Sequence, residues 1–182
     1  MNEEIEEVKR LRKNVLRYGK ACSAEEKYFA HVIYVLEKRG PLLVRGRIPE
    51  LGLGGRKFPN RVRRHFIGLL SDFKEYPFVS LRKHHLDLHL SDCKASQKLA
   101  AVEAGNYAKV AELLSARIKK LEGLTPFVSL TPAEIMRLRE FAFHCALQHE
   151  KAARQFNLEN IAELHGKVAQ EFRRIAHLIA LR

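Results

Sequence analysis

Arginine and lysine side chains are concentrated in residues 41–90, which carry ten basic and four acidic side chains and so half of the net charge of +12. A guanidinium group stays charged at physiological pH and can bind two phosphate oxygens at once. Clustered cations of this kind indicate a polyanionic partner. We therefore expect this stretch to contact the backbone of DNA or RNA. The residues expected to do so are Arg45, Arg47, Arg56, Lys57, Arg61, Arg63, Arg64, Arg82, Lys83, His84 and His85.

A second group that could do chemistry is a pair of histidines, His149 and His165. Apolar residues recur around them at alternating spacings of three and four, over 135–156 and again over 158–179. Two such seams joined by a short turn predict an antiparallel helical hairpin in which the two histidines face each other. Cys145 lies one turn away, but no carboxylate or further thiol occupies a neighbouring seam position. We therefore expect a hydrogen-bonded or water-bridged pair, which would repel when both rings are protonated at low pH.

A third group has the spacing H-H-x3-H-x3-C and consists of His84, His85, His89 and Cys93. The alternating pattern around the histidines predicts a strand, in which successive side chains point to opposite faces. The four side chains are therefore not expected to converge. Cysteine pairs of the C-x2-C type, which mark many zinc sites, are absent from the sequence. We expect no bound metal ion and no cofactor.

Enzyme signatures are largely missing, since the sequence contains no GxxxxGK[ST], GxGxxG, HExxH or GxSxG motif. Arg139 and His144 have an R-x4-H spacing that resembles that of HEPN-type ribonucleases. This resemblance implies a nuclease and is limited to the spacing. Because no acid and base can be placed together, we expect a non-catalytic protein.

The N-terminal half is expected to fold as helices joined by short breaks. Gly19 and the pair Gly40-Pro41 are read as helix ends, because glycine and proline interrupt helices. In residues 77–91 the period changes to two, which predicts a β-hairpin whose basic tip is formed by residues 83–85. The elements expected here are helices at about 3–18, 24–39 and 61–75, followed by that hairpin.

The C-terminal half is expected to be entirely helical. Gly105-Asn106 should break the first helical stretch, and Thr131-Pro132-Ala133-Glu134 is a strong helix start that combines a capping box with proline at the first helical position. The expected helices lie at about 91–104, 107–122, 132–155 and 158–181. The sequence thus predicts two domains, a basic N-terminal domain over 1–91 and a helical domain over 92–182.

The order of elements over about 24–91 is helix, short apolar strand, loop, basic helix and hairpin, which is that of a winged-helix domain. The segment IGLLSDFKEYPFVSLRKHHLDLHLS resembles the second half of winged helices of the OST-HTH (LOTUS) type. In those modules a "small-xxL-xxx-hydrophobic-P" helix end passes straight into the wing. The resemblance implies RNA or protein recognition without catalysis, and winged helices in general would add DNA. The predicted fold is mainly α, a winged-helix-like domain with one β-hairpin followed by a helical region that ends in the antiparallel hairpin.

Composition sets the remaining expectations. The chain of 182 residues is 46% apolar and 30% charged, which is typical of a globular protein. It has no run of about eighteen apolar residues, so no membrane association is expected. Its three cysteines are few and odd in number, which favours reduced thiols and an intracellular location, in the cytoplasm, nucleoid or nucleus.

Two functions are left open by the sequence. In the first, a non-catalytic nucleic-acid-binding protein contacts phosphates through its basic helix and wing. In the second, the chain is a structural subunit of a larger assembly. In both, the C-terminal helices are free to bind a protein partner or a second copy of the chain.

Overall fold

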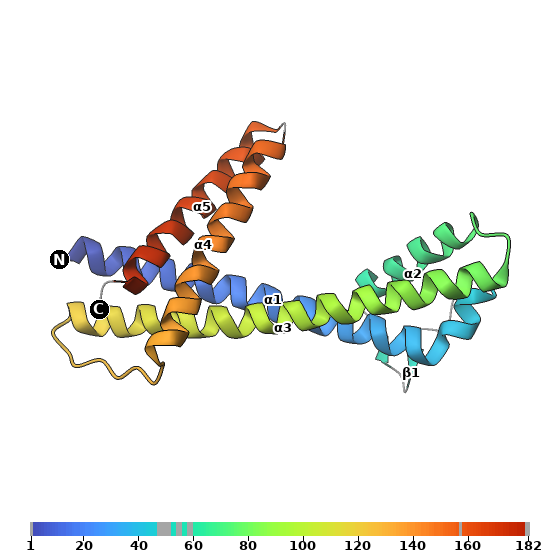
Figure 1. Ribbon diagram of the computed structural model, residues 1–182, viewed down its shortest axis with the longest axis horizontal. Coiled ribbons are helices and arrows are strands. Elements are labelled where there is room, and N and C mark those ends of the chain that lie inside the picture. The colour runs from blue at the N-terminus through green and yellow to red at the C-terminus, as the bar shows by residue number, and fades with distance from the viewer. Residues whose placement is uncertain (1, 47–51, 54–55, 58–59, 157, 181–182) are drawn as a thin grey trace. The chain divides into compact units, whose positions relative to one another are not determined.

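The computed structural model describes residues 2–46, 52–53, 56–57, 60–156 and 158–180, and most of these are helical (Figure 1). A two-residue antiparallel strand pair, β1 (Gly52–Leu53) and β2 (Arg56–Lys57), precedes α2. None of the helices in these ranges combines the length and hydropathy needed to cross a bilayer. The helices are α1 (Asn2–Val44), α2 (Asn60–Phe73), α3 (Val79–Leu121), α4 (Pro132–Gln155) and α5 (Glu159–Ala180).

The chain forms two compact units. Unit 1 comprises Met1–Ala21 and Glu103–Arg182, and unit 2 comprises Cys22–Val102. The long helices α1 and α3 each contribute one part to either unit. Residue 91, the boundary expected from the sequence, lies within α3.

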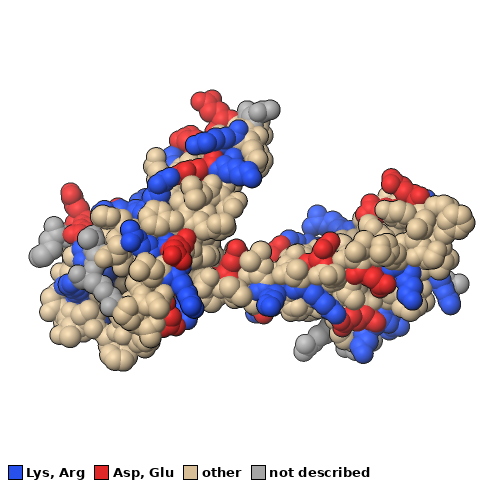
Figure 2. Space-filling view, viewed as in Figure 1, with Lys and Arg blue, Asp and Glu red and all other residues tan. Residues whose placement is uncertain are grey.

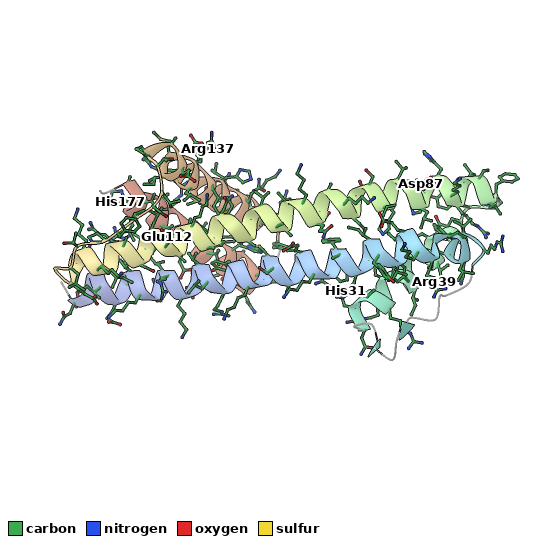
Figure 3. All side chains as sticks on the ribbon, turned by 90° about the horizontal axis from the view of Figure 1, so that it is seen from below. His31, Arg39, Asp87, Glu112, Arg137 and His177 are labelled. Carbon is green, nitrogen blue, oxygen red and sulfur yellow. The ribbon has the colours of Figure 1, made fainter. Side chains whose placement is uncertain are left out.

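Unit 2 is a three-helix arrangement of the second part of α1, α2 and the first part of α3. Its α2 places apolar side chains three and four residues apart, so that they share one face. Those side chains belong to one buried core with side chains of α1 and α3. Figure 3 labels Arg39 on α1 and Asp87 on α3, and these two helices lie side by side in this unit. The buried core comprises Val32, Ile33, Val35, Leu36, Leu43 and Val44 of α1, Val62, Phe66, Leu69 and Phe73 of α2, and Leu86 and Cys93 of α3.

Unit 1 joins the first part of α1 and the second part of α3 to the hairpin of α4 and α5. Thr131 caps α4: its hydroxyl accepts from the Glu134 backbone N–H, and the Glu134 carboxylate accepts from the Thr131 backbone N–H. Helices α4 and α5 lie side by side and antiparallel (Figure 1). The buried side chains include Val8, Leu11 and Val15 of α1, Leu114 of α3, Leu138 of α4 and Phe172 and Ile175 of α5.

The predicted winged helix is wrong, because the expected β-hairpin at 77–91 is the beginning of α3. The leucines at 86, 88 and 90 fit a period of two, but in a helix Leu86 and Leu90 share one side and Leu88 points away. Leu88 is 53% exposed, whereas Leu86 is buried. No β-branched residue occurs between Val79 and Val102, and this absence favours a helix over a strand.

The predicted helix ends at glycine are also corrected, since α1 continues through Gly19 and Gly40 and contains Pro41. A Cβ at Gly19 would lie 3.2 Å from Tyr107 Cβ, and one at Gly40 would lie 2.9 Å from Leu86 Cδ2. Both glycines therefore permit close approach of α3 within their own units. Helix α3 likewise runs through Gly105, where no atom lies within 4 Å of an added Cβ.

Candidate functional site

Among the described residues, the basic side chains expected to bind phosphates have different surroundings. On the face drawn in Figure 2, basic and acidic side chains are interspersed over both units. Arg47 lies outside the described residues, and for Arg56 and Lys57 only the backbone of β2 is described. Four further basic residues lie on α3 and not on the predicted wing: Arg82, Lys83, His84 and His85.

Arg61 of α2 has a structural task. Its Nη1 and Nη2 atoms donate to Glu25 Oε2 and Oε1 at 2.5 and 2.8 Å. Its guanidinium group also lies over the Tyr28 ring, 4.0 Å from the centroid. Both partners belong to α1, so Arg61 joins α2 to α1 although its side chain is exposed.

Arg63 and Arg64 differ from Arg61, because both are exposed and neither makes an ion pair with any described residue. Arg64 and Ile67 lie on the side of α2 away from Val62 and Phe66, and Arg63 lies at the edge of that side. Lys74, also exposed, follows the end of the helix. We call Arg63, Arg64 and Lys74, with the exposed Asn60 and Ser71, the outer face of α2.

The basic residues near the start of α3 are divided between internal and exposed roles. Arg82 Nε donates to the Tyr76 carbonyl oxygen at 2.8 Å, which fixes the turn before α3. His85 is half-buried and packs against the Tyr76 ring, with 5.1 Å between centroids. Lys83 and His84 are exposed, as is Arg45 just after α1.

A cavity of about 570 Å³ lies between the end of α1 and the start of α3 in unit 2. Its lining is largely apolar and includes Leu36, Val44 and Leu86. Arg45 and Lys83 also line it, but so do the carboxylates of Glu37 and Asp87. The mixed charge does not favour a phosphate group in this cavity.

Three side chains able to hold a metal ion meet elsewhere in unit 2: His65 of α2, and His89 and Cys93 of α3. One potential ligand atom from each lies within 4.8 Å of the other two. The two Nε2 atoms are 2.7 Å apart, and Cys93 Sγ lies 3.8 Å from His89 Nε2. The thiol is buried and the imidazoles are half-buried. We call these three residues the His65–His89–Cys93 cluster.

Neighbouring rings hold the cluster in place. The Tyr28 hydroxyl is 2.8 Å from His65 Nδ1, on the side of the imidazole away from His89. His85, one helical turn before His89, stacks on its ring with 6.5 Å between centroids and 8° between planes. The cluster therefore has an ordered rim of aromatic side chains.

The surroundings of the cluster favour uncharged forms. Burial lowers the pKa of His65, and the charge of His89 lowers it further. Burial lowers the pKa of His89 as well, with a further contribution from His85. Burial raises the pKa of the Cys93 thiol to about 11. A thiol with so high a pKa is a poor nucleophile at neutral pH, since the thiolate is the reactive form.

The His65–His89–Cys93 cluster was not predicted from the sequence, for one reason. Residues 85, 89 and 93 are spaced four apart, which aligns side chains on a helix but not on a strand. With a strand predicted for 86–90, these side chains were not expected to share one side. His65 gave no signal of its own, because it is brought in by the packing of α2.

In unit 1 the structure brings His149 and His165 together, with their Nδ1 atoms 2.8 Å apart. Phe156 stacks on the His165 ring and Phe172 on the His149 ring, at centroid distances of 5.4 and 6.0 Å. Burial lowers the pKa of His149, and the charge of His165 adds to this effect. Cys145 does not join the pair; its Sγ lies 3.6 Å from the Tyr107 hydroxyl.

The R-x4-H pair is not assembled into a catalytic site. The guanidinium of Arg139 lies over the Phe143 ring at 5.5 Å, and His144 Nε2 lies 3.4 Å from Gln148 Nε2. His144 comes five positions after Arg139 along α4, so the two side chains point in directions roughly 140° apart. No contact between Arg139 and His144 occurs among the described side chains.

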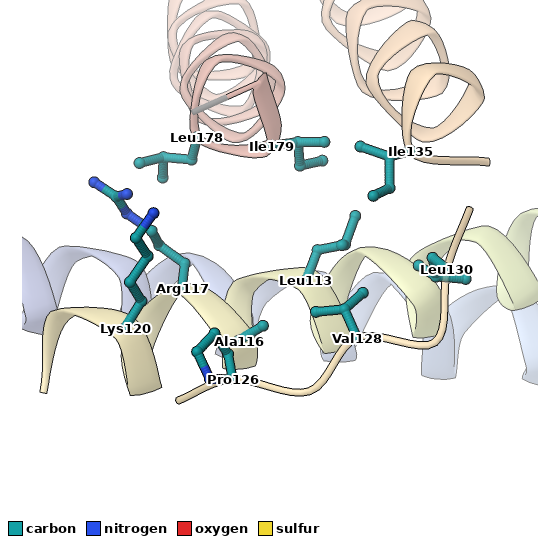
Figure 4. Close-up of a pocket in the computed structure, with 10 residues that line it drawn as sticks. All are labelled: Leu113, Ala116, Arg117, Lys120, Pro126, Val128, Leu130, Ile135, Leu178 and Ile179. Carbon is teal, nitrogen blue, oxygen red and sulfur yellow. The ribbon is translucent and has the colours of Figure 1, made fainter. Parts of the chain in front are cut away.

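Unit 1 also contains a pocket of about 410 Å³ between α3, the segment after it and the α4–α5 hairpin (Figure 4). Leu113, Val128 and Ile135 form part of its apolar lining. Arg117 and Lys120 lie together at the end near Leu178 (Figure 4). Arg117 Nη2 donates to Glu4 at 2.9 Å, so the cation already has an acidic partner.

The chain matches no protein-family model, no curated protein and no solved structure. The proposals below are therefore argued from the side chains of the chain alone. Three features stand out: the outer face of α2, the His65–His89–Cys93 cluster and the pair of His149 with His165.

Proposed function

We propose that the chain is a non-catalytic, intracellular nucleic-acid-binding protein whose unit 2 contacts phosphate groups through the outer face of α2. The observation that carries this proposal is the state of Arg63 and Arg64. They are adjacent and exposed, and they make no ion pair within the described part of the chain. Exposed arginines that have no internal partner can bind phosphate oxygens of a nucleic-acid backbone.

The packing of α2 against the rest of unit 2 favours the same function. Helix α2 is held by four buried side chains, Val62, Phe66, Leu69 and Phe73, and by the bidentate pair of Arg61 with Glu25. A rigid helix presents its outer face in one orientation, so less conformational freedom is lost on binding.

The charge of unit 2 would attract a polyanion over a longer range. Residues 22–102 carry 15 basic and 8 acidic side chains, a net charge of +7 out of the +12 of the whole chain. Such an excess accelerates encounter with nucleic acid and makes affinity depend on salt.

The test is fluorescence anisotropy with a short DNA duplex, an RNA duplex and single-stranded RNA of matched length. Replacing both arginines (Arg63→Glu with Arg64→Glu) should weaken binding to the preferred nucleic acid by at least about tenfold. The matched control is Lys13→Glu with Arg17→Glu, which changes the net charge equally at exposed positions of unit 1. Equal loss in both double variants, or no binding by the wild-type chain, would reject the proposal.

A second candidate function, that of an assembly subunit, is favoured by apolar side chains on the outside of α4. Met136, Phe143 and Leu147 share one side of the helix and are 57%, 36% and 57% exposed. Their occupant on this proposal is a second copy of the chain, because symmetric homo-oligomers are the commonest assemblies. Light scattering should then show a dimer that Met136→Glu with Leu147→Glu converts to a monomer. A wild-type monomer at all concentrations would reject it.

A further inference from the structure

We propose that His65, His89 and Cys93 form a binding site for a single transition-metal ion, with Zn²⁺ as its natural occupant. The donor set is two imidazole nitrogens and one thiolate, the types of ligand that zinc prefers in proteins. The site goes beyond nucleic-acid binding and does not depend on it.

Two of the three distances between the donor atoms are near those of a zinc site, and all three are within 4.8 Å. Tetrahedral bonds of about 2.0 Å to nitrogen and 2.3 Å to sulfur place two nitrogens about 3.3 Å apart, and a nitrogen and a sulfur about 3.5 Å apart. The distance between His89 Nε2 and Cys93 Sγ is 3.8 Å, near the second value. The two Nε2 atoms, 2.7 Å apart, would need to separate by about half an ångström, which small side-chain rotations can supply.

The helices present the ligands without distortion of the backbone. His89 and Cys93 are one turn apart on the same side of α3, and His65 faces them from α2. The buried Val62, Phe66 and Leu86 belong to the same core and hold the two helices together. A metal ion would therefore join α2 to α3 and restrain the helix that carries Arg63 and Arg64.

Tyr28 prepares His65 for this role. A metal bound at Nε2 requires the proton of the neutral ring to lie on Nδ1, from which it can be donated to an acceptor. The Tyr28 hydroxyl oxygen is 2.8 Å from that Nδ1 atom and can accept it. Tyr28 is thus a positioning residue that directs Nε2 of His65 toward His89.

Cys93 is better explained as a ligand than as a nucleophile or a redox centre. It is buried, with 2% of its surface exposed, and its Sγ lies 3.8 Å from His89 Nε2. A divalent ion within bonding distance is the charge that would displace the thiol proton. The other two cysteines, Cys22 and Cys145, are not part of the cluster.

Zinc is favoured over copper by what the donor set lacks. A histidine pair with one cysteine also occurs in electron-transfer copper sites, whose weak axial ligand is commonly methionine and in some cases glutamine or a backbone oxygen. The two methionines of the chain, Met1 and Met136, both fall outside residues 22–102. Three protein ligands leave one tetrahedral position for water or another donor.

The test is titration of the full-length, reduced protein with Co²⁺, followed by competition with Zn²⁺ and Cu²⁺. We expect one equivalent of Co²⁺ to give the intense visible bands of a tetrahedral ion and a thiolate charge-transfer band in the near ultraviolet. Zn²⁺ should displace it. A wild-type chain without the thiolate band, or one that retains Cu²⁺ and not Zn²⁺ after dialysis, would overturn the assignment.

Variants locate the ion. Cys93→Ser should remove the charge-transfer band, and His65→Gln or His89→Gln should weaken Zn²⁺ binding by at least about a hundredfold, whereas Tyr28→Phe should cost about tenfold. Cys145→Ser and His84→Gln are the controls and should bind as the wild type does. Circular dichroism checks that each variant is folded. Full binding by folded Cys93→Ser would overturn the proposal, and so would equal losses in the controls.

Discussion

His149 of α4 and His165 of α5 meet with their Nδ1 atoms 2.8 Å apart, so that one ring donates a hydrogen bond to the other. Only one proton fits between two such nitrogens. When the second ring is protonated, the acceptor is lost and two cations lie side by side. The contact therefore joins the two helices only while at least one ring is neutral.

The α4–α5 hairpin should lose stability as the pH falls. Because the pKa of His149 in the folded chain lies below the unfolded value of about 6.5, the unfolded chain binds protons first. The full contribution of His149 is present above that value, and it decreases as the pH falls from there toward the folded pKa. Hydrogen exchange of α4 and α5 amides, corrected for intrinsic rates, should show this decrease between about pH 8 and 5.5.

A double variant separates the pair from other titrating groups. His149→Leu with His165→Leu should make exchange of the hairpin nearly independent of pH, while His144→Gln, at an exposed position of α4, should leave the dependence intact. Protection that is the same at both ends of the range in the wild-type chain would contradict the role given to the pair.

Two helical glycines of unit 1 should respond differently to alanine. At Gly105 nothing lies within 4 Å of an added Cβ, so Gly105→Ala should raise the free energy of unfolding by about 0.5–1 kcal/mol. At Gly19 an added Cβ would lie 3.2 Å from Tyr107 Cβ, which belongs to another helix. In Gly19→Ala the gain in helix propensity is opposed by the cost of displacing α3. We therefore expect its free energy of unfolding to be about 1 kcal/mol lower than that of Gly105→Ala. Urea denaturation measures both, and equal effects would show that α1 and α3 are not in close contact at Gly19.

Arg61 should contribute to stability rather than to nucleic-acid affinity. Its side chain is 57% exposed and that of Glu25 is 37% exposed, so their ion pair and the contact with Tyr28 together stabilise unit 2 by about 1 kcal/mol. A double-mutant cycle of Arg61→Ala and Glu25→Ala by urea denaturation should show a coupling of about half a kcal/mol. Arg61→Lys should recover only part of it, because an ammonium group cannot make the bidentate pair. Zero coupling would contradict the anchoring role.

Local patterns with a strong period could be predicted from the sequence. The inward face of α2 follows from the spacing of Val62, Phe66, Leu69 and Phe73, all of which are buried. The start of α4 follows from Thr131 and its capping box. The register that sets His149 opposite His165 follows from two apolar seams joined by a short turn.

The remaining features depend on partners far along the chain. The local sequence does not distinguish a glycine that ends a helix from one that allows another helix to pack closely. Gly19 is of the second kind, because Tyr107 of α3 packs against it. The leucines at 86–90 fit both a strand and a helix, and the packing against α1 and α2 selects the helix. The His65–His89–Cys93 cluster could not be predicted once a strand was expected there, because residues four apart share one side only on a helix.

The most direct test of nucleic-acid binding by the outer face of α2 is the salt dependence of affinity. Each phosphate contact contributes about −0.9 to the slope of log K against log salt for duplex DNA, and about −0.7 for single strands. Arg63→Gln with Arg64→Gln should therefore reduce the magnitude of the slope by about 1.5 to 2. Lys13→Gln with Arg17→Gln should leave the slope unchanged. A slope that is the same in the Arg63, Arg64 variant as in the wild-type chain would contradict the proposed function.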